Sequence, residues 1–113
     1  MRLKAEVFVA ALTRRLFAEG AMAAIERRGA AEAGAIFVRV RHRDGTESLA
    51  APAPQSVFED DHPVMRLFEM RKTRVPEAEI SEVLARERRF DPDIWVVEIE
   101  TDRPEDYLDL AEG

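Results

Sequence analysis

Cysteine is absent from the 113-residue sequence. Disulfide bonds, thiolate nucleophiles and metal sites with cysteine ligands are therefore excluded by chemistry. Long apolar runs are missing as well, because Arg14 and Arg15 soon follow the run from Val7 to Leu12 near the amino terminus. That run is too short for the core of a secretory signal or for a membrane span. We therefore expect a cytoplasmic protein that does not insert into a membrane.

Histidines are also few, and they and the serines lack the sequence motifs of common catalytic sites. The only histidines are His42 and His62, and they do not form a helical metal-binding pair. No glycine-flanked nucleophile turn surrounds any of the three serines, Ser48, Ser56 and Ser81. We expect neither a serine hydrolase nor a bound cofactor, and we interpret His42 as a solvated histidine of a hairpin.

The charges that are present are distributed unevenly. Hydrophobic residues make up 46% and charged residues 35% of the chain, a globular profile, and the net charge is −6. Residues 98–113 hold seven acids against one arginine, whereas residues 1–43 hold nine bases against four acids. The length predicts one domain covering residues 1–113, with a basic opening and an acidic end.

The first part of the chain is predicted to contain one strand and two helices. Alternating apolar residues favour a short strand from Leu3 to Val9. Apolar residues at i, i+3 and i+7 from Val9 predict a helix that extends to Gly20. The segment Ala21 to Arg28 is helix-compatible, so we expect a second helix there.

A β-hairpin is the strongest local prediction. The alternating runs Ile36 to Arg41 and Thr46 to Ala51 flank the pair Asp44-Gly45, which is typical of a tight turn. Pro52 cannot continue a central strand, so the second strand should end at about Ala51. Further on, Val64 to Arg71 is interpreted as another strand.

The last third is predicted to be a helix followed by the central strand of the sheet. Pro76 suits a helix start, and the amphipathic segment that follows, including Phe90 in its apolar stripe, ends where Pro92 disfavours helix. The apolar run from Ile94 to Val97 is then too hydrophobic for a surface. We expect Trp95 to be buried in this strand, and a short terminal helix to begin at Pro104.

These segments predict a single α+β domain. The predicted order is strand, two helices, three strands, helix and strand. This order implies a mixed or mainly antiparallel sheet of about five strands with helices packed on it.

The sequence also resembles a known family. The segments that carry the resemblance are residues 33–40, Asp44-Gly45-Thr46, Pro52-Ala53-Pro54 and, most specifically, Arg89-Phe90-Asp91-Pro92-Asp93-Ile94-Trp95-Val96-Val97-Glu98-Ile99-Glu100. They are similar to a small bacterial family known only as a domain of unknown function. The likeness covers nearly the whole chain. It implies a shared fold and brings no catalytic residue with it.

A hard-metal site is one candidate for chemistry. The carboxylates and the histidine that would supply its ligands are Asp60, Asp61, His62, Glu98 and Glu100. Such a site would suit a metal-dependent phosphodiester or phosphate hydrolase. A lysine near these acids is missing, and an acidic run beside a proline is more often a solvated loop.

A row of arginines on the hairpin is the second candidate. Strict alternation places Arg39, Arg41 and Arg43 on one face of a strand, with the spacing of phosphates in a nucleic acid strand. An aromatic platform of the kind found in single-strand binders is missing, and the chain is acidic overall. The competing interpretation is that these arginines pair across strands with Glu47, Glu69 or Glu98.

Protein association is the third candidate and the function that we expect. Separated basic and acidic regions can pair between molecules, and a hairpin edge is a common site of strand addition. We therefore expect an interaction or accessory domain that forms a homodimer or binds a protein partner through Arg39, Arg41 and Arg43. The alternatives are the metal-dependent hydrolase and a nucleic-acid-binding module.

Overall fold

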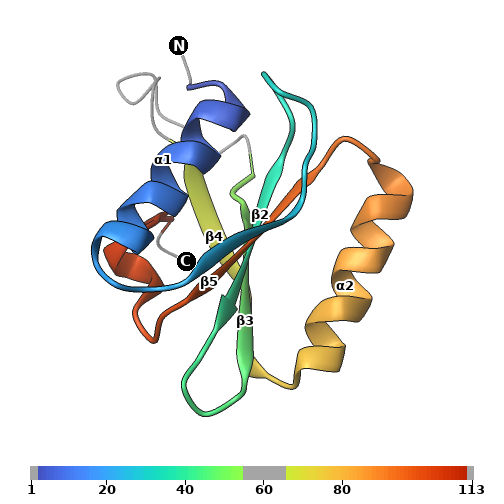
Figure 1. Ribbon diagram of the computed structural model, residues 1–113. Helices are drawn as coiled ribbons and strands as arrows, with labels where there is room; N and C mark the ends of the chain where they lie inside the picture. The colour runs from blue at the N-terminus through green and yellow to red at the C-terminus, as the bar shows by residue number, and fades with distance from the viewer. Residues whose placement is uncertain (1–2, 55–65, 112–113) are drawn as a thin grey trace.

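The computed structural model describes residues 3–54 and 66–111 (Figure 1). In chain order, the elements within these ranges are α1 (Ala5–Ala18), β1 (Ala23–Arg27), β2 (Ile36–Arg41), β3 (Glu47–Pro52), β4 (Leu67–Val75), α2 (Glu77–Phe90), β5 (Trp95–Glu100), a 3₁₀ helix (Pro104–Asp106) and β6 (Asp109–Leu110). None of the described helices has both the length and the hydropathy needed to cross a membrane.

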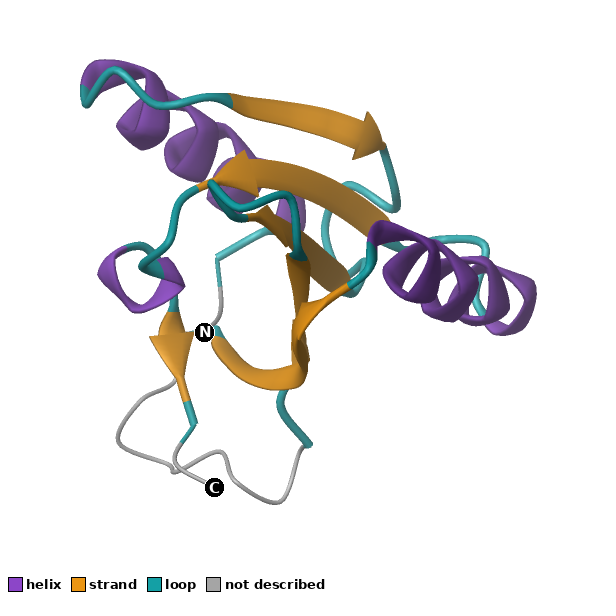
Figure 2. Cartoon of the chain, turned by 90° about the horizontal axis from the view of Figure 1, so that it is seen from below, coloured by secondary structure: helices purple, strands orange, loops and turns teal. Residues whose placement is uncertain are grey.

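The six strands form one mixed sheet with the order β1-β5-β2-β3-β4-β6. The pairs β2–β5 and β4–β6 are parallel, and the other neighbouring pairs are antiparallel. Helix α1 packs on one face and helix α2 on the other (Figures 1 and 2). The predicted α+β fold with a mixed sheet is confirmed, with one strand more than the five expected.

Strand β5 lies inside the sheet between β1 and β2, as its apolar sequence predicts. Trp95, Val97 and Ile99 point into the core beneath α1, while Ile94 and Val96 belong to the core beneath α2. The indole of Trp95 is 1% exposed, and its Nε1–H donates a hydrogen bond of 2.7 Å to a backbone carbonyl. A strand that is apolar on both faces can only be stable with a layer on each side.

The predicted strand from Leu3 to Val9 is wrong, because α1 already begins at Ala5. Its buried residues follow one helical stripe and are Ala5, Val9, Leu12 and Leu16. The apparent alternation also included Val7, which is 45% exposed and lies outside this stripe. The helix ends close to Gly20, as predicted: Gly20 has a φ of 78°, and the amides of Gly20 and Ala21 bond to carbonyls of the last helical turn.

The second predicted helix is also wrong, because Ala23–Arg27 forms the edge strand β1. This segment pairs antiparallel with β5 over Ala23 to Arg27, with a bulge between Ile25 and Arg27. The three-residue spacing of Met22 and Ile25 suggested a helix face, but both side chains are exposed. Pairing with the neighbouring strand therefore outweighed a weak local preference.

The β-hairpin of β2 and β3 is confirmed. Val38 to Arg41 pair with Glu47 to Ala50 in antiparallel register. Only Gly45 of the turn has a positive φ, at 91°, so the loop combines an ordinary turn with a left-handed glycine. The carboxylate of Asp44 accepts hydrogen bonds from the backbone amide and the hydroxyl of Thr46, at 2.9 and 2.6 Å.

The last third agrees with the sequence in most respects. Helix α2 begins directly after Pro76, and Ile80 and Leu84 are its buried residues. Phe90 is the exception, because its side chain is 83% exposed and takes no part in the apolar stripe. The terminal helix at Pro104 is a single 3₁₀ turn, after which the buried Leu108 anchors the short strand β6.

Candidate functional site at the β2–β3 hairpin

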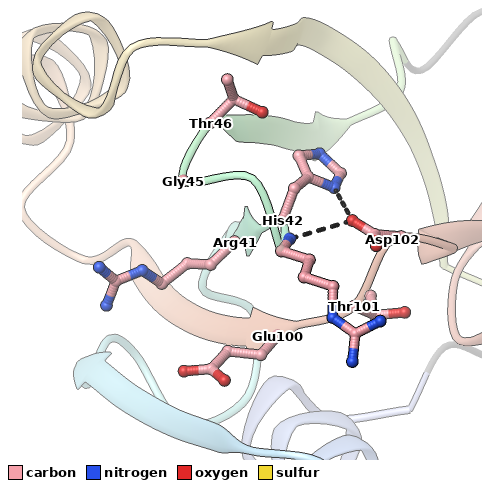
Figure 3. A pocket seen from close by; sticks show the side chains of 8 residues that line it. Arg41, His42, Gly45, Thr46, Glu100, Thr101 and Asp102 are labelled. Atoms are coloured by element: carbon pink, nitrogen blue, oxygen red, sulfur yellow. Dashed lines mark hydrogen bonds and ion pairs between the residues drawn. The ribbon is translucent and has the colours of Figure 1, made fainter.

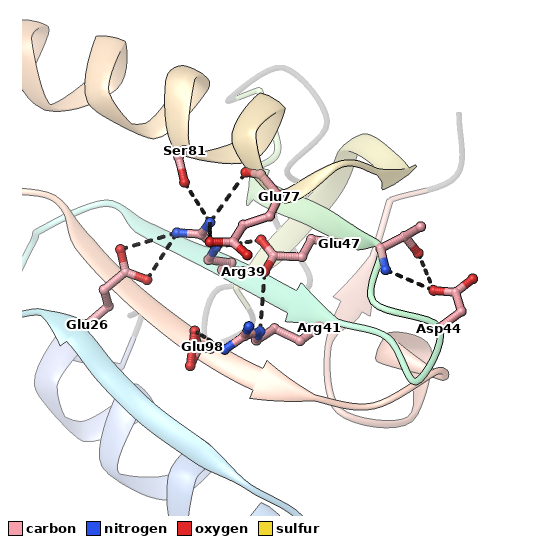
Figure 4. Close-up of polar contacts among 9 residues, drawn as sticks. Glu26, Arg39, Arg41, Asp44, Glu47, Glu77, Ser81 and Glu98 are labelled. Carbon is pink, nitrogen blue, oxygen red and sulfur yellow. Dashed lines mark hydrogen bonds and ion pairs between the residues drawn. The ribbon is translucent and has the colours of Figure 1, made fainter.

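The three hairpin arginines occupy three different environments. Arg39 and Arg41 project from β2 on the face that carries α2 (Figure 4). Arg43 lies beyond the end of β2, in the hairpin turn. Arg39 is only 7% exposed, whereas the side chain of Arg41 is 43% exposed. Alternation predicted the shared face of Arg39 and Arg41 correctly, but it was wrong for Arg43, because β2 ends at Arg41. It also did not predict the different burial of Arg39 and Arg41.

Arg39 is surrounded by partners from three other elements. Its Nε lies 2.6 Å from Oε1 of Glu47 on β3, and its Nη1 lies 3.4 Å from the carboxylate of Glu26 on β1. Its Nη2 donates a hydrogen bond of 2.7 Å to the hydroxyl of Ser81 on α2. Burial would lower the pKa of Arg39, but the hydrogen bond and charge of Glu47, together with the charges of Glu26 and Glu77, outweigh it and raise that pKa.

Glu47 joins Arg39 to Arg41. Its second oxygen lies 3.2 Å from Nε of Arg41, and Nη1 of Arg41 lies 3.3 Å from the carboxylate of Glu98 on β5. The competing interpretation, in which the hairpin arginines pair across strands with Glu47 and Glu98, therefore holds for Arg39 and Arg41. Glu69, which is on β4, instead lies opposite Ala51 of β3. Arg39 is therefore buried and connects β2 to β1, β3 and α2.

A pocket of about 570 Å³ opens at the hairpin end of the sheet (Figure 3). It lies where the parallel strands β2 and β5 both end, so segments far apart in the sequence meet there. Its lining residues are Arg41, His42, Arg43, Gly45, Thr46, Glu100, Thr101 and Asp102. Within the described part of the chain, the guanidinium of Arg43 makes no ion pair, so this pocket has a free cation at its rim.

The prediction that His42 is a solvated histidine is wrong. The residue is 8% exposed, and both ring nitrogens have partners. Nδ1 lies 3.2 Å from Oδ1 of Asp102, and Nε2 lies 2.6 Å from Oγ of Ser48. An ionised carboxylate only accepts hydrogen bonds, so Nδ1–H is the donor to Asp102. The sequence could not show this contact, because Asp102 is 60 positions away.

Ser48, His42 and Asp102 are arranged in the order of a hydrolase triad, but Ser48 cannot act as a nucleophile. A nucleophilic hydroxyl must reach the substrate, and Ser48 is only 1% exposed. Its oxygen also accepts a hydrogen bond of 2.9 Å from the backbone amide of Arg74. Arg74 has a φ of 50° beside the irregular pairing of β3 with β4. The chain of contacts therefore holds the hairpin, β4 and the segment after β5 in place.

Asp102 is the residue that ties this end of the sheet together. Besides His42, it accepts a hydrogen bond of 3.1 Å from the backbone amide of Arg43, and a guanidinium nitrogen of Arg74 lies 3.5 Å away. The hydrogen bond from the Arg43 amide is the main cause of a lowered pKa of Asp102; burial opposes it, and the His42 ring and Arg74 add to the lowering. Asp102, Thr101 and Arg74 were missed by sequence reasoning because no local motif marks them.

The metal hypothesis stays a prediction. Asp60, Asp61 and His62 lie outside the described residues. Glu98 and Glu100 lie on β5, and Glu98 is engaged by Arg41. In residues 3–54 and 66–111, no three histidine or acidic side chains converge in a way that could hold a metal ion.

The fold and this pocket define a small α+β domain whose polar depression lies at the ends of two parallel strands. The chain belongs to the DUF1491 family, described as a protein of unknown function, whose family model matches residues 3–109. The family resemblance of residues 89–100 is thereby confirmed. No match is found among curated proteins.

Solved structures of related bacterial proteins share the fold. The solution structure of protein Atu0922 from A. tumefaciens is 55% identical, with a TM-score of 0.87 over 100% of this chain and 98% of that one. The crystal structure of a DUF1491 family protein from Caulobacter crescentus CB15 is 34% identical, with a TM-score of 0.78 over 99% and 100% of the two chains. An NMR structure of a DUF1491 family protein from the same organism is also 34% identical, with a TM-score of 0.78 over 99% of each chain.

Proposed function

We propose that this protein is a non-catalytic binding domain that engages an acidic segment of a protein partner at the hairpin end of the sheet. The observation that carries the proposal is the pocket beside Arg43, whose guanidinium has no ion pair with any described residue. A guanidinium binds a carboxylate through two parallel hydrogen bonds, which gives both affinity and orientation. An acidic peptide is the partner chemistry that this free cation suits.

Two of the acids at this end of the sheet, Asp44 and Asp102, are already engaged, whereas the carboxylate of Glu100, which also lines the pocket, has no ion pair with a described residue. The carboxylate of Asp44 is held by Thr46, which lowers the pKa of Asp44, and it lies 3.5 Å from Arg74. The carboxylate of Asp102 is engaged by the His42 ring, the backbone amide of Arg43 and the guanidinium of Arg74. Arg43 is therefore left to bind a carboxylate from outside, next to the half-exposed Arg41.

The partner in this proposal can be a second copy of the same chain, in which case the protein forms a homodimer. Residues 98–113 carry a net charge of −6 and could supply the acidic segment. Light scattering at high micromolar protein concentration tests this version, and a monomer under those conditions would contradict the homodimer. A cytoplasmic location stays a prediction, which fractionation of cells would test.

The binding proposal is tested with a short glutamate-rich peptide and the ¹⁵N-labelled protein. We expect the amide signals of Arg43, Gly45 and Thr101 to shift on titration. Because a hydrogen bond to a charged group contributes roughly 1.5–3 kcal/mol, Arg43→Ala should weaken binding about tenfold or more. Arg14→Ala is the matched control, since Arg14 is exposed on α1 and does not line the pocket. Equal binding by both variants, or no shifts with the unmodified protein, would refute the proposal.

A further inference from the structure

Helix α1 is apolar on its outer side as well as on the side that packs on the sheet. Val7 and Phe17 are 45% and 56% exposed, and Leu3, which lies just before the helix, is 46% exposed. Three of the 14 residues of α1 are charged, whereas seven of the 14 residues of α2 are. A surface helix usually has a polar outer side, and a helix that is apolar all round is usually covered. The outer side of α1 therefore has the composition of a surface that packs against another one.

The exposed residues of α1 follow a heptad pattern. Leu3, Ala10 and Phe17 are seven positions apart, and so are Val7 and Arg14. Residues at this spacing lie in one stripe along a helix, and apolar stripes of this period pack against another helix. Ala10 is exposed at the middle of the stripe, and its small side chain allows two helices to approach closely. The stripe therefore suits a second helix.

Two charges on this outer side lack a partner. Neither Glu6 nor Arg14 forms an ion pair with a residue in the described part of the chain. They are eight positions apart, which is about 12 Å along a helix, so they cannot pair with each other in one copy. Their opposite signs leave no net charge on the stripe.

The other charged groups on α1 and β1 and next to them have partners within the same chain. Lys4 pairs with Glu32, and Arg15 pairs with Glu19. On and directly after β1, charged side chains contact the guanidinium of Arg39, the carbonyl of Pro92 and the ring of Trp95, and they are Glu26, Arg27 and Arg28, in that order. Glu6 and Arg14 are therefore the charges of this region that an outside partner has to match.

A second copy of α1 supplies that match when the two helices run antiparallel. A two-fold axis at Ala10 places Ala10 against its own copy, and each other residue against the one equally far beyond the axis. Glu6 then faces Arg14 of the second copy, and Leu3 faces Phe17 of the second copy. One arrangement therefore covers the exposed apolar side chains and pairs both free charges.

We propose that the outer side of α1 is a homodimer interface, in which two copies pack antiparallel about a two-fold axis at Ala10. Figure 1 shows that this side of α1 faces away from the sheet. The interface is independent of the proposed function, because none of the residues that line the hairpin pocket lies on α1. Each copy keeps Arg43 free for an acidic segment.

Sedimentation equilibrium across the micromolar range tests the proposal. The unmodified protein should change from monomer to dimer as its concentration rises. Glu6→Arg and Arg14→Glu each replace two attractive pairs by two repulsive ones, because the axis repeats every contact. Each should raise the dissociation constant roughly 10- to 100-fold. The double variant, Glu6→Arg with Arg14→Glu, restores opposite charges at both contacts and should recover most of the lost affinity.

The apolar part of the interface is tested with two exposed phenylalanines. Alanine at an interface anchor weakens binding by a factor of roughly five or more, and the axis applies that factor twice, so Phe17→Ala should weaken the dimer about 25-fold or more. Phe90→Ala removes another exposed ring, at the end of α2, and should leave the dissociation constant unchanged.

Two further controls separate this interface from general charge effects and from the hairpin. Glu82→Arg reverses an exposed charge on α2, and Arg43→Ala removes the free cation of the hairpin pocket; both should dimerise as the unmodified protein does. All substituted side chains are exposed, so folding should persist, and thermal unfolding checks it.

Four results would overturn the proposal. They are a monomer at every concentration, an unchanged dimer in Phe17→Ala, a double charge variant as weak as the single ones, and loss of the dimer in Arg43→Ala. The last result would place the interface at the hairpin.

Discussion

Glu47 offers the sharpest test of how the fold uses its charges. Its side chain is 2% exposed and contacts both Arg39 and Arg41, at 2.6 and 3.2 Å. Glu47→Gln keeps the shape but removes the negative charge, so the buried guanidinium of Arg39 loses its nearest counter-ion. Breaking a buried pair by removing one partner costs about 3–5 kcal/mol. Glutamine retains one accepting oxygen, so we expect a loss of about 3 kcal/mol, the lower end of that range.

Urea denaturation measures this loss. For a slope of roughly 1–3 kcal/mol per molar, a loss of about 3 kcal/mol lowers the midpoint by roughly 1–3 M. Glu82→Gln is the matched control, because its pair with Arg86 spans 3.5 Å on the exposed face of α2. That change should cost no more than about 0.5 kcal/mol. If the two variants lose equal stability, Glu47 does not function as a buried counter-ion. The apolar pair Arg39→Met with Glu47→Leu should recover most of the lost stability.

Two other predictions concern the ends of the sheet. Asp102 has a pKa below the usual 3.8, so its stabilising contribution is present above that pH and is lost as pH falls through the folded pKa. In an acid titration followed by NMR, the amide signal of Arg43 should shift with a midpoint below pH 3.8. Asp102→Asn should abolish that transition. A midpoint at or above pH 3.8 would contradict the hydrogen bond from the Arg43 amide to Asp102. Gly29→Ala should destabilise the protein by about 1–3 kcal/mol in thermal unfolding, because its Cβ would lie 2.2 Å from the carbonyl oxygen of Asp93. An unchanged melting temperature would show that the chain shifts there without cost.

The sequence predicted the elements in which local chemistry and tertiary environment agree. The hairpin was predictable because Asp44-Gly45 specifies a turn between two alternating runs. Strand β5 was predictable because only a doubly covered strand accommodates the apolar run around Trp95. Helix α2 was predictable from Pro76 and its amphipathic stripe.

The amino-terminal elements were not predictable from the sequence, because the deciding information lies elsewhere in the chain. The segment Ala23–Arg27 is a strand because it pairs with β5, about 70 residues later. Leu3 to Val9 fits both periodicities over so short a length, and the burial of Ala5 and Val9 against the sheet decided for a helix. Short apolar runs leave this ambiguity whenever two periods coincide.

The surroundings of individual side chains were also not predictable, because they depend on segments far away in the sequence. Alternation placed Arg39 and Arg41 on one face, but only the packing of α2 over β2 determines that Arg39 is buried. His42 was misjudged because Ser48 and Asp102 complete its surroundings from other segments. Phe90 fits the helical stripe in sequence, yet α2 ends before the sheet covers it.

The central claim is that the hairpin divides its arginines between stability and binding. The most direct test is to measure Arg43→Ala both by urea denaturation and by titration with the glutamate-rich peptide. The account predicts a free energy of unfolding within about 0.5 kcal/mol of the unmodified protein, as for other exposed substitutions, together with a roughly tenfold loss of peptide affinity. A destabilised variant, or one that binds the peptide unchanged, would contradict it.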